Sequence, residues 1–459
     1  MNTPARFACR LRMASTRWPR RTALIDSDNC FSFAALNDQV SQRAADLQRQ
    51  GLGAETWAAL RIRNTASGII DWLAVLRAGA RVIPLSERLP QRALQDLLLE
   101  HSIPTMIPAP GAYLQHTGLA SSGTPASALC WHYERSQPCA GVASSGSTGA
   151  PRIVAHSYVN YVRNAQGALE YLPLCRQDRY LLSLPLFHVG GLGILFRCME
   201  AGVPMVLGGR AEDASFLSAR QITHVSMVET QLRRLLSNST KPLPTLRCVL
   251  LGGGPVSTDL LRQARDRGLP CYMSYGLTEM TAQVATGPAL TSAGRVLRYR
   301  ELQIDSGEIC VRGETLCLGY LVGGRVVKLE TADGWFRTSD LGHWENGQLR
   351  IIGRRDNQFI SGGENIQPEA IETVLRAHPQ VHEAAVIPRS DREFGQRPVA
   401  FIRTEGDLDP SELQHWLRAR LSPHQVPIAW HPMPDTQGLK IRRPELIALA
   451  ERLRDGVNQ

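Results

Sequence analysis

Short apolar stretches alternate with helical segments along most of this chain, and this alternation limits the fold more than any other feature. Strand-like runs at Ala58–Ile62 and Val82–Leu85 are each followed by residues of helical periodicity, at Ser67–Arg77 and Pro90–Glu100. The same order returns between residues 180 and 274. Parallel strands need a long crossover connection, which is usually a helix. The sequence therefore predicts an α/β fold with parallel sheets, and 459 residues are too many for one hydrophobic core.

A stretch rich in glycine and hydroxyl side chains interrupts the alternation and reads SSGSTGAPR. Glycine allows the backbone to approach a ligand closely, and consecutive N–H groups with Ser and Thr hydroxyls can surround an anion. The candidate phosphate ligands in it are Ser144, Ser145, Gly146, Ser147, Thr148, Gly149 and Arg152. The stretch does not end in the GK[ST] of a P-loop, and similar clusters occur in ordinary surface loops. By itself it indicates only a candidate phosphate-binding loop.

Composition narrows the classes of partner. The net charge is +9, from 51 basic and 42 acidic residues, but the basic residues are scattered and form no block with interleaved aromatics. We therefore expect no nucleic-acid partner, and a modest positive field that suits polyanionic small molecules. The ten cysteines contain no CxxC pair, which favours a reduced, cytoplasmic compartment. No run of eighteen apolar residues occurs, so no membrane span is expected.

The character of the sequence changes near Glu308. Short alternating strands with glycine turns follow this residue, and they predict a small antiparallel β-barrel that completes a large N-terminal domain. From Asn357 the order becomes strand, helix, strand, strand, helix, as in a compact α+β unit of common domain size. We therefore expect one domain at residues 1–353, a second at 354–459, and a hinge near 354–357.

Five motifs occur in one order along the chain and together resemble a known superfamily. They are SSGSTGAPR, YGLTE at Tyr275–Glu279, TSD at Thr338–Asp340, GRRDNQFISGGENIQPEAIE at Gly353–Glu372, and Lys440 near the C-terminus. This order resembles the adenylate-forming superfamily of acyl- and aryl-CoA synthetases, adenylation domains and luciferases. Three further features resemble the o-succinylbenzoate–CoA ligase family of menaquinone biosynthesis: SLPLFHVGG at Ser183–Gly191 with Arg197 after it, LLGGGPV at Leu250–Val256, and SGGENIQPE. The resemblance implies ATP, Mg²⁺ and coenzyme A, and a small C-terminal domain that moves.

The resemblance also implies roles for residues around the nucleotide. The glycine-rich stretch would hold the β- and γ-phosphates, with Arg152 where the family usually has lysine. The two cations are not equivalent, because the arginine guanidinium is a planar fork of donors and the lysine ammonium is a compact point charge. Tyr275 would face adenine, Thr278 would donate to the α-phosphate, and Glu279 would bind Mg²⁺. Gly252, Gly253 and Gly254 would let the backbone approach adenine and the acyl group closely. Asp340 and Arg354 would contact the ribose, and Ser274 and Gly276 would also bind the nucleotide. Considered singly, Glu279 also suits a helix N-terminus, and Asp340 an N-cap or turn.

The acyl side of the reaction has its own candidates. By resemblance, Lys440 would bridge the acyl carboxylate and the α-phosphate, and His188 would lie at the mouth of the acyl pocket. Arg197 falls within an apolar helix, where a buried charge needs a partner. That partner is either Glu200, three residues on, or the second carboxylate of a dicarboxylic acid. Ser226 and Thr230 are accessory donors for the acid.

The second half-reaction adds residues of the small domain. Asp356 matches the hinge position of the family, and the SGGEN loop with Ser361, Gly362 and Gly363 would line the coenzyme A tunnel. Three alternatives stay open: a ligase for another aryl or medium-chain acid, an adenylation enzyme that loads a carrier protein, and a catalytically silent binding protein. Oligomeric state is also open, and a homo-oligomer is one outcome.

Overall fold

The structure is a computed structural model. It describes residues 5–27, 29–107, 115–116, 128–144, 152–172, 174–289, 294–406, 408–434 and 443–455. The chain divides into two compact units. The first contains Met1–Gly254, Ala264–Leu302 and Val311–Phe336, and the second contains Pro255–Gln263, Gln303–Cys310 and Arg337–Gln459. The predicted domain boundary after residue 353 stays a prediction, as does the hinge.

The first unit contains an eight-stranded sheet whose inner strands are parallel. In order across the sheet the strands are β21 (Arg325–Lys328), β20 (Gly319–Val322), β10 (Arg152–Ser157), β9 (Pro138–Ser144), β5 (Arg81–Ser86), β4 (Trp57–Ile62), β6 (Thr105–Ile107) and β7 (Gln115–His116). The run β9-β5-β4-β6 is parallel, and antiparallel strands flank it. Strands β4 and β5 are buried along nearly their whole length, as strands of a sheet covered on both faces are.

A nine-stranded sheet repeats this design. Its order is β17 (Arg295–Val296), β16 (Ala282–Pro288), β15 (Cys271–Leu277), β14 (Cys248–Leu251), β13 (His224–Met227), β11 (Tyr180–Leu181), β12 (Met205–Val206), β2 (Thr22–Asp26) and β3 (Asn29–Ser32). All strands from β15 to β2 run parallel. The antiparallel strands β3, β16 and β17 lie at the edges. The predicted fold class, α/β with parallel sheets, is confirmed.

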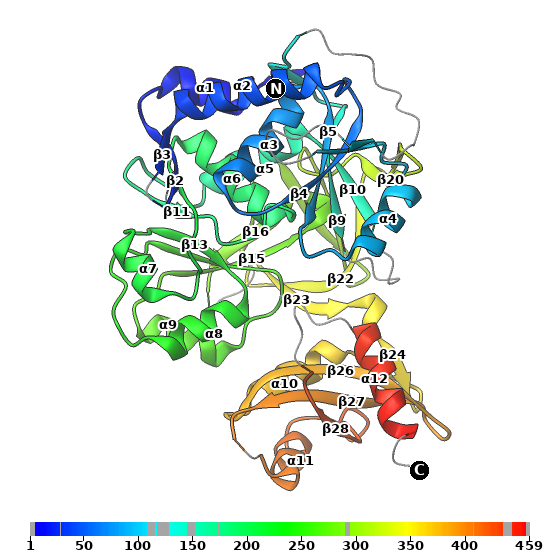
Figure 1. Ribbon diagram of the computed structural model, residues 1–459. Coiled ribbons are helices and arrows are strands. Elements are labelled where there is room, and N and C mark those ends of the chain that lie inside the picture. The colour runs from blue at the N-terminus through cyan, green and yellow to red at the C-terminus, as the bar shows by residue number, and fades with distance from the viewer. Residues whose placement is uncertain are drawn as a thin grey trace. The chain divides into compact units, whose positions relative to one another are not determined.

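Helices connect and cover these strands (Figure 1). They are α1 (Arg10–Arg17), α2 (Phe33–Arg49), α3 (Ala66–Arg77), α4 (Gln91–Glu100), α5 (Tyr158–Leu169), α6 (Val189–Ala201), α7 (Ala214–Ala219) and α8 (Glu229–Asn238). A further helix, α9 (Thr258–Asp266), has residues in both units. A separate two-stranded sheet pairs β1 (Arg6–Ala8) with β8 (His132–Glu134). No helix in the described part of the chain combines the length and apolar character needed to cross a membrane.

Aromatic side chains from three helices form the centre of the first unit. Trp72 of α3 packs edge-on against Tyr161 of α5 with ring centroids 6.0 Å apart, and Tyr161 stacks on Phe196 of α6 at 5.1 Å. Residues of both large sheets join the same buried cluster, for example Leu60 of β4 and Tyr180 of β11. Helix α6 is therefore fixed inside the core, which determines where its functional residues point.

The remaining strands and helices follow Arg300. A four-stranded sheet has the order β18 (Arg300–Asp305), β19 (Glu308–Gly313), β22 (Phe336–Glu345) and β23 (Gln348–Arg354). The short strands predicted as a small barrel supply this sheet, while β20 and β21 extend the eight-stranded sheet instead. The C-terminal sheet contains β25 (Glu364–Ile366), β24 (Phe359–Ser361), β27 (Gly395–Thr404), β26 (Val381–Asp391) and β28 (Trp430–Pro432). Its helices are α10 (Pro368–Arg376), α11 (Pro410–Arg418) and α12 (Arg443–Asp455).

Candidate active site

The candidate residues of the first unit gather at the carboxyl ends of parallel strands. Met227, Leu251 and Met273 lie opposite one another in the register of β13, β14 and β15. The segments that leave these strands therefore emerge at one edge of the sheet, which is where ligands bind in open α/β sheets. The ends of these strands and the segments that follow them carry the predicted site residues Ser226, Thr230, Gly252, Gly253, Gly254, Ser274, Tyr275, Gly276, Thr278 and Glu279.

Two glycines shape this edge. Gly253 has φ +83°, a backbone conformation that glycine adopts without strain. A Cβ atom on Gly276 would lie 2.0 Å from the carbonyl oxygen of Ala282, so only glycine fits where the pairing of β15 with β16 shifts register. The side chain of Tyr275 beside it is 8% exposed. Gly276 thus lets β15 approach β16 closely just before the segment that holds Thr278 and Glu279.

His156 of β10 contacts the backbone of the segment that holds Thr278 and Glu279. Its Nε2 lies 2.8 Å from the carbonyl oxygen of Thr278, and its side chain is fully buried. Burial lowers the pKa of His156 to about 4. The imidazole is therefore neutral at pH 7, and its Nε2–H donates to the Thr278 carbonyl. Strand β10 follows the glycine-rich stretch directly, so the two predicted phosphate-binding segments are connected through His156.

A second contact joins the same two segments. The hydroxyl of Tyr320 donates to Glu279 Oε1 at 3.0 Å, and the Arg152 guanidinium lies 5.5 Å from the centre of the Tyr320 ring. Tyr320 pairs with Val154 across β20 and β10, and Arg152 pairs with Ser144 across β10 and β9. Burial and the charge of Glu279 raise the pKa of Tyr320, so the phenol stays a donor. Arg152 and Glu279, far apart in sequence, lie on either side of one tyrosine.

This arrangement fits a magnesium ion that arrives with a nucleotide. One carboxylate oxygen of Glu279 is fixed by Tyr320. Mg²⁺ is typically held by one or two carboxylates together with substrate phosphates. No cluster of three His, Cys, Asp or Glu side chains suited to a metal occurs among the described residues. A single carboxylate held in this way suits a Mg²⁺ ion that also binds phosphate oxygens of a nucleotide.

The loop before α6 is held in a fixed shape. Asn64 donates through Nδ2 to the carbonyl oxygens of Leu182 and Leu184, and its Oδ1 accepts from the N–H of Leu186. His188 is the N-cap residue of α6, and its side chain is exposed. The predicted acyl-side histidine therefore stands at the start of the buried helix that carries Arg197.

Arg197 is almost completely buried, with 2% of its surface exposed. Its Nη1 donates to Gln283 Oε1 at 2.6 Å and its Nη2 to the Tyr180 hydroxyl at 3.3 Å. The Tyr180 hydroxyl in turn lies 2.9 Å from Ser226 Oγ. Within the described residues, Arg197 forms no ion pair with a carboxylate. Ser226 therefore belongs to the same hydrogen-bonded group as Arg197.

The alternative that Glu200 neutralises Arg197 is wrong. Glu200 Oε1 instead lies 2.7 Å from Arg10 Nε of α1. The two residues are three apart on one helix, but the Arg197 side chain reaches strands β11 and β16, whereas Glu200 meets a cation brought by another helix. Among the described residues the partners of Arg197 are thus neutral groups, which favours the interpretation that an acid substrate supplies a carboxylate to it.

The second unit holds the remaining described candidates. Arg354 donates through Nη1 to Asp340 Oδ1 at 3.0 Å and through Nη2 to Asp356 Oδ2 at 2.9 Å. The predicted ribose pair and the predicted hinge residue are therefore bonded to one another. Ser361 is 1% exposed, and its neighbours Gly362 and Gly363 have φ +59° and +88°. Ser145–Gly149 and Lys440 lie outside the described residues.

Four residues of this region are absent from the sequence-based candidates: Tyr320, His156, Gln283 and Arg300, whose Nε donates to the main-chain oxygen of Gln283 at 2.7 Å. Each acts through a contact with a residue far away in the chain, for example 122 positions in the case of His156 and Thr278. A tyrosine, a glutamine or an arginine within a strand carries no local signature of such a role. One local signal is that His156 and Gln283 each stand next to apolar residues of the same strand.

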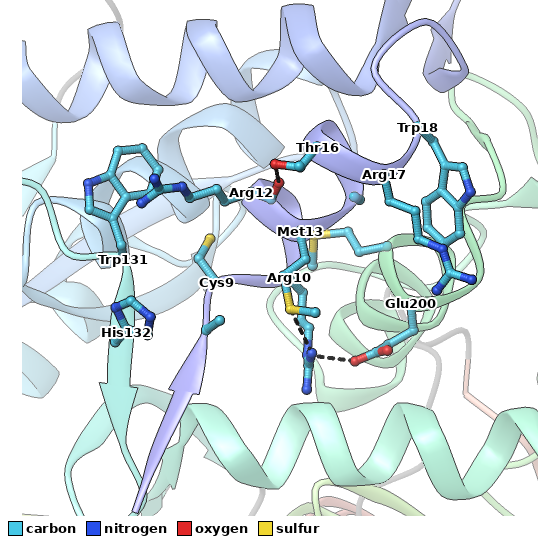
Figure 2. Close-up of a pocket in the computed structure, with 13 residues that line it drawn as sticks. Cys9, Arg10, Arg12, Met13, Thr16, Arg17, Trp18, Trp131, His132 and Glu200 are labelled. Atoms are coloured by element: carbon cyan, nitrogen blue, oxygen red, sulfur yellow. Dashed lines mark hydrogen bonds and ion pairs between the residues drawn. The ribbon is translucent and has the colours of Figure 1, made fainter. Parts of the chain in front are cut away.

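A cavity of about 490 Å³ lies elsewhere in the first unit and is lined by α1, by the start of β8 and by the end of α6. Figure 2 shows the side chains that line it. None of the predicted site residues lines it. Its charged groups already have partners in its wall. Arg12 lies 4.4 Å from the Trp131 ring, Arg17 lies 4.8 Å from that of Trp18, and Arg10 pairs with Glu200.

Known proteins are similar to this chain in sequence and in fold. Residues 11–321 match the AMP-binding enzyme family, and residues 370–437 match the C-terminal domain of AMP-binding enzymes. The 2-succinylbenzoate–CoA ligase of Escherichia coli (strain K12) is 37% identical over 441 residues, which cover 94% of this chain and 95% of that protein.

Solved structures agree with this assignment. A variant of E. coli MenE with bound OSB-AMS has a TM-score of 0.86 and 34% identity, and the match covers 98% of this chain and 99% of that one. The o-succinylbenzoate coenzyme A synthetase (MenE) from Bacillus subtilis, in complex with ATP and a magnesium ion, has a TM-score of 0.84 and 27% identity, with 96% and 99% covered. This chain belongs to the AMP-binding enzyme family and groups with its 2-succinylbenzoate–CoA ligases.

Proposed function

We propose that this protein is an AMP-forming acid–thiol ligase that converts o-succinylbenzoate to o-succinylbenzoyl-CoA for menaquinone biosynthesis. The observation that carries the choice of acid is Arg197, a buried cation whose described partners are the neutral groups of Gln283 and Tyr180. A buried charge is stable only when it is paired or well solvated by polar groups. A dicarboxylic acid reacts through one carboxylate and offers the other as the partner.

In the first half-reaction, a carboxylate oxygen of the acid attacks the α-phosphorus of ATP, and pyrophosphate leaves. Thr278 would donate to the α-phosphate, and Lys440 would stabilise the charge that develops between phosphate and carboxylate. Glu279 would hold Mg²⁺, which neutralises phosphate charge when bound. The glycine-rich stretch from Ser144 to Gly149 and Arg152 would hold the leaving phosphates.

The second half-reaction consumes the acyl-adenylate. The sulfur of coenzyme A attacks the adenylate carbonyl, a C–S bond forms, and AMP leaves with its phosphate oxygen. The small domain would turn between the two halves about Asp356, so that Gly362 and Gly363 line the approach of the thiol. Asp340 and Arg354 would hold the ribose through both steps. The cytoplasmic location and a homo-oligomeric state stay predictions.

The test is a product analysis with purified protein. With o-succinylbenzoate, ATP, Mg²⁺ and coenzyme A, we expect equal amounts of AMP and an acyl-CoA of the corresponding mass. Without coenzyme A, we expect pyrophosphate and enzyme-bound acyl-adenylate. Formation of ADP would contradict the mechanism. Absence of turnover with any acid in a panel of aryl and medium-chain acids would favour a silent binding protein.

A further inference from the structure

A second buried guanidinium lies close to Arg197, and no predicted role accounts for it. Arg300 of β18 is 5% exposed. It donates to three backbone carbonyl oxygens, through Nε to Gln283 at 2.7 Å, through Nη1 to Arg298 at 2.7 Å and through Nη2 to Asn164 at 3.1 Å. Within the described residues it meets no carboxylate. Burial, and then the charge of Arg197, lower the pKa of Arg300 to about 9. Two like charges therefore influence one another inside the core.

Gln283 joins the two cations. Its side-chain oxygen accepts from Arg197 Nη1, and its main-chain oxygen accepts from Arg300 Nε. Its side-chain nitrogen donates to Thr286 Oγ1 at 2.9 Å. The amide is therefore engaged at both ends, which fixes its oxygen towards Arg197. Any shift of the β16 backbone at Gln283 would move the partner of Arg197.

The absence of a side chain at Gly167 leaves space for the Arg300 guanidinium. A Cβ atom on Gly167 of α5 would lie 2.3 Å from Arg300 Nη1 and 2.5 Å from the Arg298 carbonyl oxygen. A helix interior disfavours glycine relative to alanine. That unfavourable residue thus makes room for the guanidinium. An apolar side chain would fill the same space without bringing charge into the core, so the charge calls for an explanation beyond packing.

We propose that Arg300 is a positioning residue for the second carboxylate of the acid: it fixes Gln283, Gln283 fixes the Arg197 guanidinium, and both positive charges favour an anion at Arg197. This proposal rests on the proposed function, since it requires a dicarboxylic substrate. Arg300 itself does not touch the acid. An anion bound at Arg197 relieves the repulsion between the two cations, so the substrate is bound more tightly than a single arginine would allow.

The test compares three acids with four proteins. The acids are o-succinylbenzoate and the two mono-acids obtained by replacing either of its carboxylates with hydrogen. The proteins are wild type, Arg300→Met, Arg300→Lys and Arg298→Met. Arg298 is the matched control, because its side chain is 53% exposed and it lies two residues away. KM and kcat for the acid are measured at saturating ATP and coenzyme A.

We expect Arg300→Met to raise KM for o-succinylbenzoate at least tenfold with kcat changed less than about threefold, because a poorly positioned Arg197 would weaken binding of the acid equally in the ground state and the transition state. The mono-acid that wild type uses should show no such rise. Arg300→Lys keeps the charge but not the forked guanidinium, so its KM for o-succinylbenzoate should lie between those of wild type and Arg300→Met. Arg298→Met should have the same KM as wild type. An equal change for the dicarboxylic and mono-acids, or unchanged KM for all, would overturn the proposal and leave Arg300 a structural residue.

A second variant keeps the proposal testable where Arg300→Met does not fold. Gln283→Met removes the acceptor of Arg197 and leaves the main-chain bond to Arg300. It should reproduce the selective rise in KM, and an unselective effect would again overturn the proposal. Failure of the proposed function looks different, because wild type would then not prefer o-succinylbenzoate over the mono-acids.

Discussion

Tyr320 donates a hydrogen bond of 3.0 Å to the carboxylate of Glu279, while its ring lies under the guanidinium of Arg152. One side chain thus connects the predicted Mg²⁺ ligand with the last residue of the predicted phosphate loop. The contact arises from sheet pairing, since β20 adds to the edge of β10 and brings Tyr320 opposite Val154. The two predicted nucleotide-binding segments are therefore held together by a tyrosine from a third segment.

The first prediction concerns this hydroxyl. Tyr320→Phe should raise KM for MgATP about tenfold, because a hydrogen bond to a charged group contributes about 1.5 kcal/mol. KM for the acid should change little. Tyr171→Phe is the control, because Tyr171 is half-buried and contacts Tyr272 through its ring. Initial rates at varied MgATP concentration give KM for wild type and both variants. An unchanged KM in Tyr320→Phe would show that Glu279 does not depend on the hydrogen bond from Tyr320.

The second prediction concerns pH and His156. Its pKa in the folded protein, about 4, lies below the ordinary value of 6.5. The unfolded chain therefore binds a proton more readily, so the contribution of neutral His156 to stability is complete above pH 6.5 and is lost as pH falls towards 4. This difference corresponds to on the order of 3 kcal/mol.

Thermal unfolding of wild type and His156→Gln checks this. The variant should have the lower Tm at pH 7.5, and the gap should close as pH is lowered to 4.5. His343→Gln, at an exposed position, should follow wild type throughout. Parallel profiles for wild type and His156→Gln would mean that the imidazole is not buried in its neutral form.

The third prediction concerns the hinge. Asp356→Pro fixes φ near −65° and removes a backbone donor. We expect the acyl-adenylate to accumulate while transfer to coenzyme A slows, because the domain turn is blocked. Asp356→Ala is the control, since it removes the bond to Arg354 but leaves the backbone free. Single-turnover measurements separate the two steps, and a proline variant with wild-type steady-state turnover would refute the hinge assignment.

The fourth prediction concerns Lys440. Lys440→Ala should slow adenylation by about 10²- to 10³-fold, as removal of a preorganised group at a developing charge does. Thioester formation from supplied acyl-adenylate should survive. Arg442→Ala, two residues away, should leave both steps near wild type. Pyrophosphate exchange reports the first step and thioester release the second, so equal loss of both would contradict the assignment.

The parallel sheets could be predicted from the sequence because their strands are buried and are separated by helices. Buried strands appear as short apolar runs, and the helices between them show apolar residues at helical spacing. Helix α1 was missed for the opposite reason. Only Leu11 and Ala14 of it are buried, and its arginines are placed by contacts with Trp131 and Glu200 from elsewhere. Such a helix depends on tertiary packing, and local pattern does not reveal it.

The site shows the same division. Motifs within one segment, such as Tyr275–Glu279, were predicted, and the structure places them at one edge of the sheet. Of the two partners left open for Arg197, Glu200 is excluded by its pair with Arg10, because the spacing i, i+3 allows a local ion pair but carries no information about a cation on another helix. Gln283 and Arg300 could not be predicted, since their roles depend on register between strands and on space left by Gly167.

The most direct test of the account is the selectivity of wild type and Arg197→Ala between o-succinylbenzoate and its mono-acids. The measured quantity is kcat/KM for each acid, with the exposed Arg210→Ala as control. We predict that wild type strongly prefers the dicarboxylic acid. Arg197→Ala should lose about 2–5 kcal/mol of that preference, the range for removing one partner of a buried charge pair. Equal loss for all acids, or a wild-type preference for a mono-acid, would contradict the account.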